Sequence, residues 1–268
     1  MVNGGKIAVV YKARETETLR VIGTIKKILK PEVIEEHSLP SLTKRSLRGF
    51  DLIVCLGGDG TLVRTSRAVE NETLILPVNM GKKGYLIEVD PENLKYHLEK
   101  YRENNFLVEK CFKLKIDYGN RVLNAVNEVA IRNIIGLKQV ELLVELDEGS
   151  FVVEGDGFLV STPIGSSAYS LNAGGPFVLS NVNALICTPL CARKPLRPLI
   201  VNKDEVIKVK YLSGEEIHMI IDGEEALKTN LKEIIRITGS SETVNIVRFS
   251  NSFNVKRMSR LAEGVENG

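Results

Sequence analysis

The sequence is poor in the residues that build metal and disulfide sites. It has no tryptophan, four cysteines and three histidines in 268 residues. The cysteines lie in mainly apolar surroundings, and no second Cys or His pair follows at a zinc-site spacing, so we expect no structural metal site. Buried cysteines are common as packing residues, and we expect reduced thiols in a cytoplasmic protein.

Charge of one sign and long apolar runs are also missing. The chain has 36 Lys and Arg against 34 Asp and Glu, a formal net charge of +2. This balance gives no general attraction to nucleic acid or to an anionic membrane, and we expect neither as a partner. No run reaches the ~18 apolar residues of a transmembrane helix, and the opening residues lack the apolar core of a signal peptide.

The chain does contain a glycine-rich turn directly after a buried strand. Residues 52–56 form an uninterrupted apolar run, typical of a strand covered on both faces of a parallel sheet. Helical spacing begins at Thr61, and between the two stand Gly57, Gly58, Asp59 and Gly60. Backbone N–H groups at such a turn suit a phosphate. An acid among them is explained if it holds a cation beside the phosphates or takes a proton from an attacking hydroxyl.

Two common nucleotide-binding patterns are not found in this stretch. The spacing fits neither the G-x-G-x-x-G fingerprint nor the G-x-x-x-x-G-K-[ST] loop, which argues against a nicotinamide oxidoreductase and a P-loop enzyme. A purely structural interpretation stays open at this point, because any strand-to-helix turn favours Gly and Asp.

The order of elements predicts two domains. Apolar strands at 7–11, 52–56 and 73–79 alternate with helical patterns, which indicates a Rossmann-like α/β domain. Short alternating strands and turn signals then predict a β-sandwich domain over 103–242. We expect the α/β domain to comprise 1–102 and 243–268, with the C-terminal segment returning to it.

Asn127 and Glu128 are two polar residues inside an otherwise apolar strand pattern, 125–131. Neighbouring side chains on a strand point to opposite faces, so one of the two faces inward. A buried carboxylate needs a partner, and ribose hydroxyls or an adenine amine would be suitable donors. The alternative is one residue on the solvent face and one at a strand end.

Residues 154–176 hold more hydroxyl groups than helix capping requires. A helix cap uses one such group, whereas this stretch ends a strand at Thr162 and then crowds hydroxyls around a Gly turn. We expect the excess to bind a polar ligand, with ordinary capping as the alternative. Asp156 suits a turn or a ligand contact, and Asp222-Gly223 is typical of a β-hairpin turn.

Taken together, these motifs resemble the NAD kinase family. In the family's order they are Gly-Gly-Asp-Gly-Thr at 57–61, Asn-x-Gly-x-x-Gly-Tyr-Leu at 79–86, Asn-Glu at 127–128, Asp-Gly at 156–157, Ser-Thr-Pro-x-Gly-Ser-Ser-Ala-Tyr at 161–169, Ala-Gly-Gly-Pro at 173–176 and Asp-Gly at 222–223. Each motif alone is weak, but the ordered set is specific. Tyr85, Ser167 and Glu224 depart from the usual residues, which leaves the NAD or NADH preference and the phosphate donor open.

The resemblance implies a phosphotransferase. It would move the γ-phosphoryl group of ATP, or of another donor, to the adenosine-ribose 2′-hydroxyl of NAD, giving NADP. Mg²⁺ would be held mainly by the donor phosphates, with or without Asp59. The family fold is an α/β domain with a β-sandwich domain that binds NAD, assembled as a homodimer or homotetramer.

The resemblance also implies a role for each matching residue. Asp59 would be the catalytic base or the acid that positions the metal, and the glycines at 57, 58 and 60 would cradle donor phosphates. Asn127 and Glu128 would bind the adenosine of NAD, Asp156 its nicotinamide side, and 167–172 the adenine and ribose. The remaining positions assigned to ligand contact are Arg64, Asn79, Gly81, Gly84, Tyr85, Lys138, Thr162, Ser166, Ser167, Ala168, Tyr169, Ser170, Asn172 and Asp222.

Two rival functions are compatible with part of the pattern. Lipid and sphingoid kinases share the Gly-Gly-Asp-Gly-Thr turn, but they need an apolar channel, whereas the hydroxyl-rich stretch suits a polar, sugar-bearing acceptor. A non-catalytic dinucleotide sensor would favour an uncharged residue at position 59.

Overall fold

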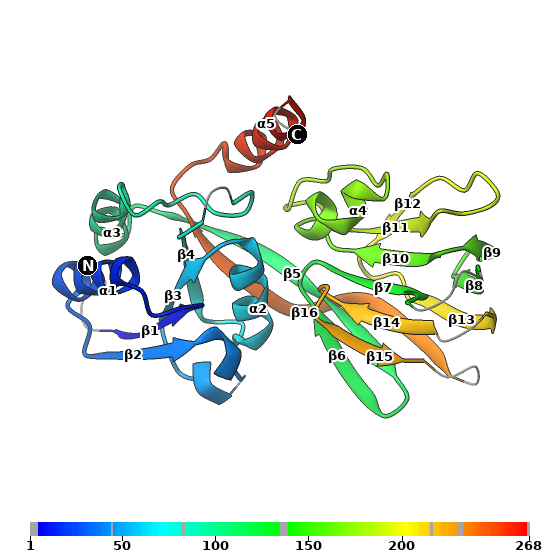
Figure 1. Cartoon of the computed structure of the whole chain (residues 1–268), viewed down its shortest axis with the longest axis horizontal. Helices are drawn as coiled ribbons and strands as arrows, with labels where there is room; N and C mark the ends of the chain where they lie inside the picture. Colours follow the sequence, from blue (N-terminus) through cyan, green and yellow to red (C-terminus); the bar gives the residue numbers. More distant parts are fainter. Residues whose placement is uncertain are drawn as a thin grey trace. The chain divides into compact units, whose positions relative to one another are not determined.

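The computed structural model describes residues 5–43, 45–81, 84–134, 139–214, 217–229 and 233–266 (Figure 1). The chain divides into two compact units, Met1–Lys110 with Thr243–Gly268, and Cys111–Glu242. The first crossing falls inside a strand, whereas the sequence-based division ends the first domain at 102, before that strand. The predicted fold class is confirmed, because an α/β unit that includes the C-terminal segment is joined to a β-rich unit.

The α/β unit is built on a parallel sheet. Neighbouring strands pair in the order β2-β1-β3-β4-β16, each pair in parallel. Every residue of β3 is buried, as the uninterrupted apolar run predicts. The strand bounds are β1 (Lys6–Tyr11), β2 (Val33–Ser38), β3 (Leu52–Gly57), β4 (Leu74–Asn79) and β16 (Ile234–Arg248).

Helices cover both faces of this sheet. α1 (Thr16–Leu29) and α3 (Leu94–Arg102) pack on one face, where Ile25 and Leu98 share a core with Val54. α2 (Asp59–Ala68) packs on the other face, where the Thr65 hydroxyl lies 3.6 Å from the Cys55 sulfur. The last helix, α5 (Phe253–Glu266), follows β16.

The strand order creates a natural place for a ligand. The chain runs from β1 to β2 on one side and then passes back across β1 to form β3. In open α/β sheets, ligands bind outside the carboxyl ends of the strands where the order reverses. In this unit, that place lies beyond Tyr11 and Gly57, at the ends of β1 and β3.

The β-rich unit contains two layers of strands. One layer has the order β6-β5-β16-β13-β8-β9, and the other has the order β12-β11-β10-β7-β14-β15. The bounds are β5 (Leu107–Tyr118), β6 (Arg121–Ala125), β7 (Glu128–Asn133), β8 (Val140–Leu146), β9 (Gly149–Gly155), β10 (Gly157–Ser161), β11 (Ala184–Leu190), β12 (Leu199–Asn202), β13 (Ile207–Ser213), β14 (Ile217–Ile221) and β15 (Glu225–Lys228).

A single apolar core joins these two layers into a sandwich. Leu114 and Val144 contribute from the first layer, and Val129, Phe158 and Met219 contribute from the second. After β10 the sequence predicts a helix, but the structure has only a 3₁₀ turn (Gly165–Ser167) and the short α4 (Tyr169–Asn172). A glycine at 174 in a left-handed conformation, φ 87°, then ends the helical turn.

In the part of the chain that the structure describes, no helix combines the length and the apolar character needed to cross a membrane.

Candidate active site

The glycines after β3 differ in what surrounds them. A Cβ at Gly57 would collide with the Thr61 side chain, so close packing of the turn on α2 requires glycine there. A Cβ at Gly58 or Gly60 would have no atom within 4 Å. Gly58 is the N-cap of α2, and no side chain caps this helix. Backbone N–H groups of a helix start are therefore open to an anion.

A pocket of about 300 Å³ lies at the carboxyl ends of β1 and β3, where the strand order reverses. Its lining includes Lys12 and Ala13 after β1, Gly57 at the end of β3, Gly58 directly after it, and Gly81 after β4. Glu15 and Glu17 also line the pocket, so its charge is mixed, and what suits a phosphorylated ligand is the glycine-rich backbone and the helix start.

Asp59 is held in the first turn of α2 by the loop that follows β4. Its Oδ2 accepts the Tyr85 N–H at 2.8 Å, and its Oδ1 accepts the Leu86 N–H at 3.0 Å. Each carboxylate oxygen has two lone pairs, so each keeps one for a further contact. A Cβ at Gly84 would lie 3.1 Å from Asp59 Oδ1, which explains the glycine there. The side chain is partly buried and fixed in orientation.

Asn79 shapes the start of the same loop. Its Nδ2 donates to Asp90 Oδ1 and its Oδ1 accepts the Gly81 N–H, both at 3.1 Å. Ligand contact by Asn79 stays a prediction, and the structure gives its amide a role in holding the loop. Tyr85 is partly exposed, as is Arg64 on α2, which has interaction partners of its own.

In the β-rich unit, Asp222 organises the turn that carries Asn127 and Glu128. Its carboxylate accepts the N–H groups of Val126, Asn127 and Glu128 at 2.7–3.1 Å. Asp222 itself stands at φ 50° in the hairpin turn that the Asp-Gly pair predicts. The structure therefore gives Asp222 a role in building the turn, and direct ligand contact stays a prediction.

Three side chains around this turn have polar atoms without protein partners. Among the described residues, Asn127 Oδ1, Glu128 Oε2 and Ser161 Oγ are buried with no hydrogen bond. Glu128 and Ser161 stand opposite each other on β7 and β10, so their side chains share a face. Burial, and then Asp222, raise the pKa of Glu128 to about 8. Buried polar atoms without partners are costly, and a ligand that donates hydrogen bonds would remove that cost.

Three of the hydroxyls assigned to ligand contact have structural roles in the loop, and ligand contact by them stays a prediction. Thr162, Ser166 and Ser170 are fully buried and serve the loop itself. Thr162 donates to Val126 O at 2.6 Å, and Ser166 donates to Pro163 O at 2.7 Å. Ser170 lies 3.0 Å from the Thr188 hydroxyl. Their excess over helix capping thus has a structural reason, because they satisfy backbone and hydroxyl groups inside a compact loop.

The other predicted positions of the β-rich unit are more accessible. Ser167, Ala168 and Tyr169 are partly exposed, and Asn172 is exposed. The Tyr169 hydroxyl accepts a hydrogen bond from Arg132 Nη1 at 2.8 Å. Lys138 lies outside the described residues.

Asp156 is exposed in the turn between β9 and β10. Its carboxylate accepts a hydrogen bond from the Cys191 thiol, and this contact raises the pKa of the thiol.

Comparison with known proteins agrees with this arrangement along nearly the whole chain. Residues 6–106 match the family model of the ATP-NAD kinase N-terminal domain, and residues 126–249 match that of the C-terminal domain. The NAD kinase of Methanothermobacter thermautotrophicus is 36% identical over 220 residues, which cover 80% of this chain and 77% of that protein. The chain belongs to the NAD kinase family. The NAD kinase of Methanosphaera stadtmanae is 31% identical to this chain, over 92% of this chain and 96% of that protein.

Solved structures of NAD kinases show the same fold. The chain is similar to an NAD kinase from Archaeoglobus fulgidus in complex with ATP, with a TM-score of 0.80 and 26% identity, over 96% of this chain and 98% of that one. It also shares the fold of yeast NADH kinase complexed with NADH, with a TM-score of 0.83 and 19% identity, over 97% and 88% of the two chains.

The described residues offer few protein ligands for a metal ion. Among the described residues, no three His, Cys, Asp or Glu side chains cluster so that they could hold a metal ion. Mg²⁺ is commonly bound through one or two carboxylates together with substrate phosphates. Asp59, with a free lone pair on each oxygen, fits the protein's share of such a site.

Motif reasoning missed two parts of the site. Ser161 belongs to a motif but has no predicted role, although its hydroxyl lacks a hydrogen-bond partner among the described residues. Lys12 lines the pocket but belongs to no motif. A signal for Lys12 exists in the topology, since it directly follows the strand beside which the chain reverses.

Proposed function

We propose that this protein phosphorylates the adenosine-ribose 2′-hydroxyl of NAD, with ATP or another phosphate donor, to give NADP. One observation carries the proposal, namely the hold on Asp59. Two backbone N–H groups fix its carboxylate at the start of a helix whose neighbouring glycines are open to an anion. A carboxylate fixed beside such a turn is explained if it takes part in the reaction. For phosphate binding alone, an uncharged residue would be favoured.

The α/β unit would handle the donor phosphates. Gly58, Gly60 and the start of α2 offer backbone N–H groups, and the adjoining pocket is lined by Lys12 together with Glu15 and Glu17. The Archaeoglobus fulgidus relative binds ATP, which supports the same donor for this chain.

The β-rich unit would bind the adenosine part of NAD. The unpartnered oxygens of Asn127 and Glu128 can accept hydrogen bonds from an adenine amine or from ribose hydroxyls. The Ser161 hydroxyl can donate or accept on the same face. The yeast relative is an NADH kinase complexed with NADH, so a parallel assay with NADH in place of NAD would show which oxidation state of the nicotinamide is preferred here.

The chemistry divides between bond exchange and positioning. The ribose oxygen forms a bond to the γ-phosphorus, the bond from that phosphorus to the β,γ-bridging oxygen breaks, and the hydroxyl proton leaves. A free lone pair of Asp59 would accept that proton or orient the attacking hydroxyl. Bound Mg²⁺ would neutralise charge on the phosphates. Because phosphoryl transfer needs little covalent help, positioning and charge neutralisation supply most of the acceleration.

The test removes the charge of Asp59 and measures NADP formation from NAD, ATP and Mg²⁺. We expect Asp59→Asn to lower kcat by ~10²–10⁴ while the affinity for NAD largely survives. Glu70→Gln is the matched control, since Glu70 is an exposed acid just beyond the end of the same helix. Near-full activity of Asp59→Asn, with a normal thermal unfolding profile, would contradict the role of Asp59.

A cytoplasmic location and a homodimer or homotetramer complete the proposal. No disulfide joins any two of the four cysteines, which agrees with a reducing compartment. Light scattering of the purified protein would give the number of subunits.

A further inference from the structure

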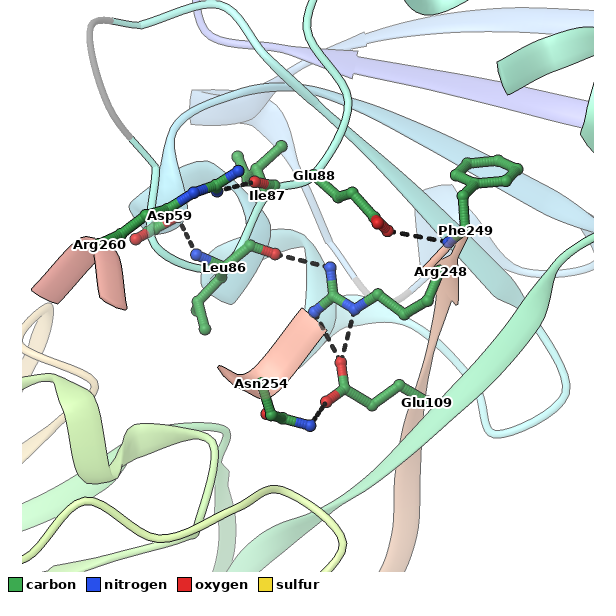
Figure 2. A network of polar contacts seen from close by, with 9 residues as sticks. All are labelled: Asp59, Leu86, Ile87, Glu88, Glu109, Arg248, Phe249, Asn254 and Arg260. Carbon is green, nitrogen blue, oxygen red and sulfur yellow. Dashed lines mark hydrogen bonds and ion pairs between the residues drawn. The ribbon is translucent and has the colours of Figure 1, made fainter. Parts of the chain in front are cut away.

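The loop 84–88 supplies both N–H groups to Asp59, and residues of the C-terminal segment form hydrogen bonds with this loop. Figure 2 shows the side chains of Arg248 and Arg260 and the backbone of Phe249, directly after β16, reaching this loop. Arg260 on α5 donates from Nη1 to Ile87 O at 2.9 Å and to Gly84 O at 3.3 Å. Arg248, at the end of β16, donates to Leu86 O at 2.8 Å.

The bond of Arg260 to Gly84 has a direct connection to Asp59. The carbonyl of Gly84 and the N–H of Tyr85 belong to the same planar peptide unit. The guanidinium binds one end of this unit, and the other end donates to Asp59 Oδ2. A cation at the carbonyl polarises the peptide and strengthens its N–H as a donor. It also fixes the rotation of the peptide plane, and thereby the direction of that N–H.

We propose that Arg260 is a positioning residue for phosphoryl transfer, acting through the peptide between Gly84 and Tyr85 on the carboxylate of Asp59. The inference rests on the proposed function, because it matters for catalysis only if Asp59 serves the reaction. The α5 helix thereby becomes part of the active-site support, although none of its residues belongs to a family motif.

The two arginines differ in how much stability depends on them. Arg248 is 3% exposed, pairs with Glu109 at 2.6 Å and stacks on the Phe253 ring at 3.6 Å. Its loss would disturb the fold as a whole. Arg260 is only partly buried, and both of its hydrogen bonds recorded among the described residues go to the loop. Arg260 is therefore the residue to test.

The first experiment separates positioning from binding. We expect Arg260→Met to lower kcat about tenfold, with KM for NAD and for ATP changed less than about twofold, because misdirection of Asp59 affects the reacting geometry. Arg260→Lys, which keeps a charge but loses the planar fork, should recover part of kcat. Lys256→Met, an exposed cation on the same helix, is the control and should stay at the wild-type rate. A kcat of Arg260→Met within about twofold of wild type would overturn the proposal.

The second experiment tests the route through Asp59. In the Asp59→Asn background, Arg260→Met should lower kcat no further, because the group on which it acts has already lost its charge. If kcat of the double variant fell by about a further tenfold, Arg260 would act on a group other than Asp59, which would contradict the proposal.

Hydrogen exchange gives a readout that needs no activity. The amide protons of Tyr85 and Leu86 should exchange faster in Arg260→Met than in wild type, and should be unchanged in Lys256→Met. Unchanged exchange in Arg260→Met would overturn the structural link. If the wild type made no NADP but the exchange rates changed as expected, the proposed function would fail and the hold of Arg260 on the loop would stand.

Discussion

Two carboxyl groups show how local surroundings set different roles. Asp59 accepts two backbone N–H groups, one at each oxygen. Glu128 is 6% exposed, and its Oε2 has no hydrogen-bond partner within the described residues. Burial, followed by the charge of Asp222, raises the pKa of Glu128 to about 8. In the free protein, between pH 4.5 and about 8, Glu128 thus holds a proton that an unfolded chain would release.

This proton makes stability depend on pH in a known direction. The pKa of Glu128 rises from 4.5 to about 8 on folding, so between these values the folded state binds more protons than the unfolded state. The contribution of Glu128 to the free energy of unfolding therefore falls with rising pH across that window and is flat above it. Denaturant unfolding of Glu128→Gln at several pH values should lack this decline.

The difference between wild type and Glu128→Gln is the quantity to compare, because other groups titrate as well. Glu154→Gln is a matched control, since Glu154 is paired with Arg193 near the surface and should leave the pH slope in place. Parallel pH profiles for wild type and Glu128→Gln would show that Glu128 is not a buried, protonated acid.

Residue types alone could not sort the hydroxyls of 161–170. Thr162 and Ser166 are turned to backbone groups inside the loop, whereas Ser161 finds no partner in the described part of the chain and Ser167 is partly exposed. All four have the same donor and acceptor capacity, and only the path of the loop decides which groups they meet. The sequence predicts that the stretch matters but not which hydroxyl does what.

At the scale of elements, the turn from β3 to α2 follows directly from the sequence. The apolar run, the glycines and the helical spacing predict strand, turn and helix in that order, and the structure has all three. Gly58 has φ −96° and ψ −171°, a backbone that any residue adopts, with no atom within 4 Å of an added Cβ. The fold therefore does not require glycine there.

A substitution at Gly58 separates folding from phosphate binding. We expect Gly58→Ala to keep the wild-type Tm while its KM for ATP rises about tenfold or more, because the methyl group fills space that a phosphate needs. Gly23→Ala in α1 is the control, as it also has no atom within 4 Å of an added Cβ. Steady-state kinetics with ATP as the varied substrate give the answer, and an unchanged KM would argue that phosphates bind elsewhere.

The support of Asp59 could not be predicted in the same way. Arg248 and Arg260 lie about 160 or more residues beyond the loop that they hold, and no spacing rule connects them. The return of the C-terminal segment could be predicted from a strand and helix that follow the β-rich stretch. Which of its side chains reach the loop depends on how β16 pairs with β4, and register of that kind is set by tertiary contacts.

At the scale of the whole molecule, the chain passes between its units in two strands, β5 and β16. Glu109 on β5 and Arg248 on β16 pair on the α/β side of both crossings, at 2.6 Å. The Arg248 side chain is 3% exposed and that of Glu109 is 12% exposed. This pair ties together the places where the chain leaves the α/β unit and re-enters it.

Breaking the pair should lower stability strongly. We expect Arg248→Met to cost about 3–5 kcal/mol, because it leaves the Glu109 carboxylate buried without its cation. The double variant Arg248→Met with Glu109→Leu should be more stable than Arg248→Met alone, since no unpaired charge remains. Chemical denaturation of the set measures this coupling, and additive losses would show that the two side chains do not depend on each other.

The late position of α5 in the chain has a consequence for biosynthesis. A ribosome releases β1 to β4 and the glycine turn long before it releases Arg248 and Arg260, which hold the loop around Asp59. A nascent chain can thus bury much of its parallel sheet while the acid still lacks its support. Products of a message cut short before α5 would then be poor catalysts, so that translation itself delays activity until α5 has been made.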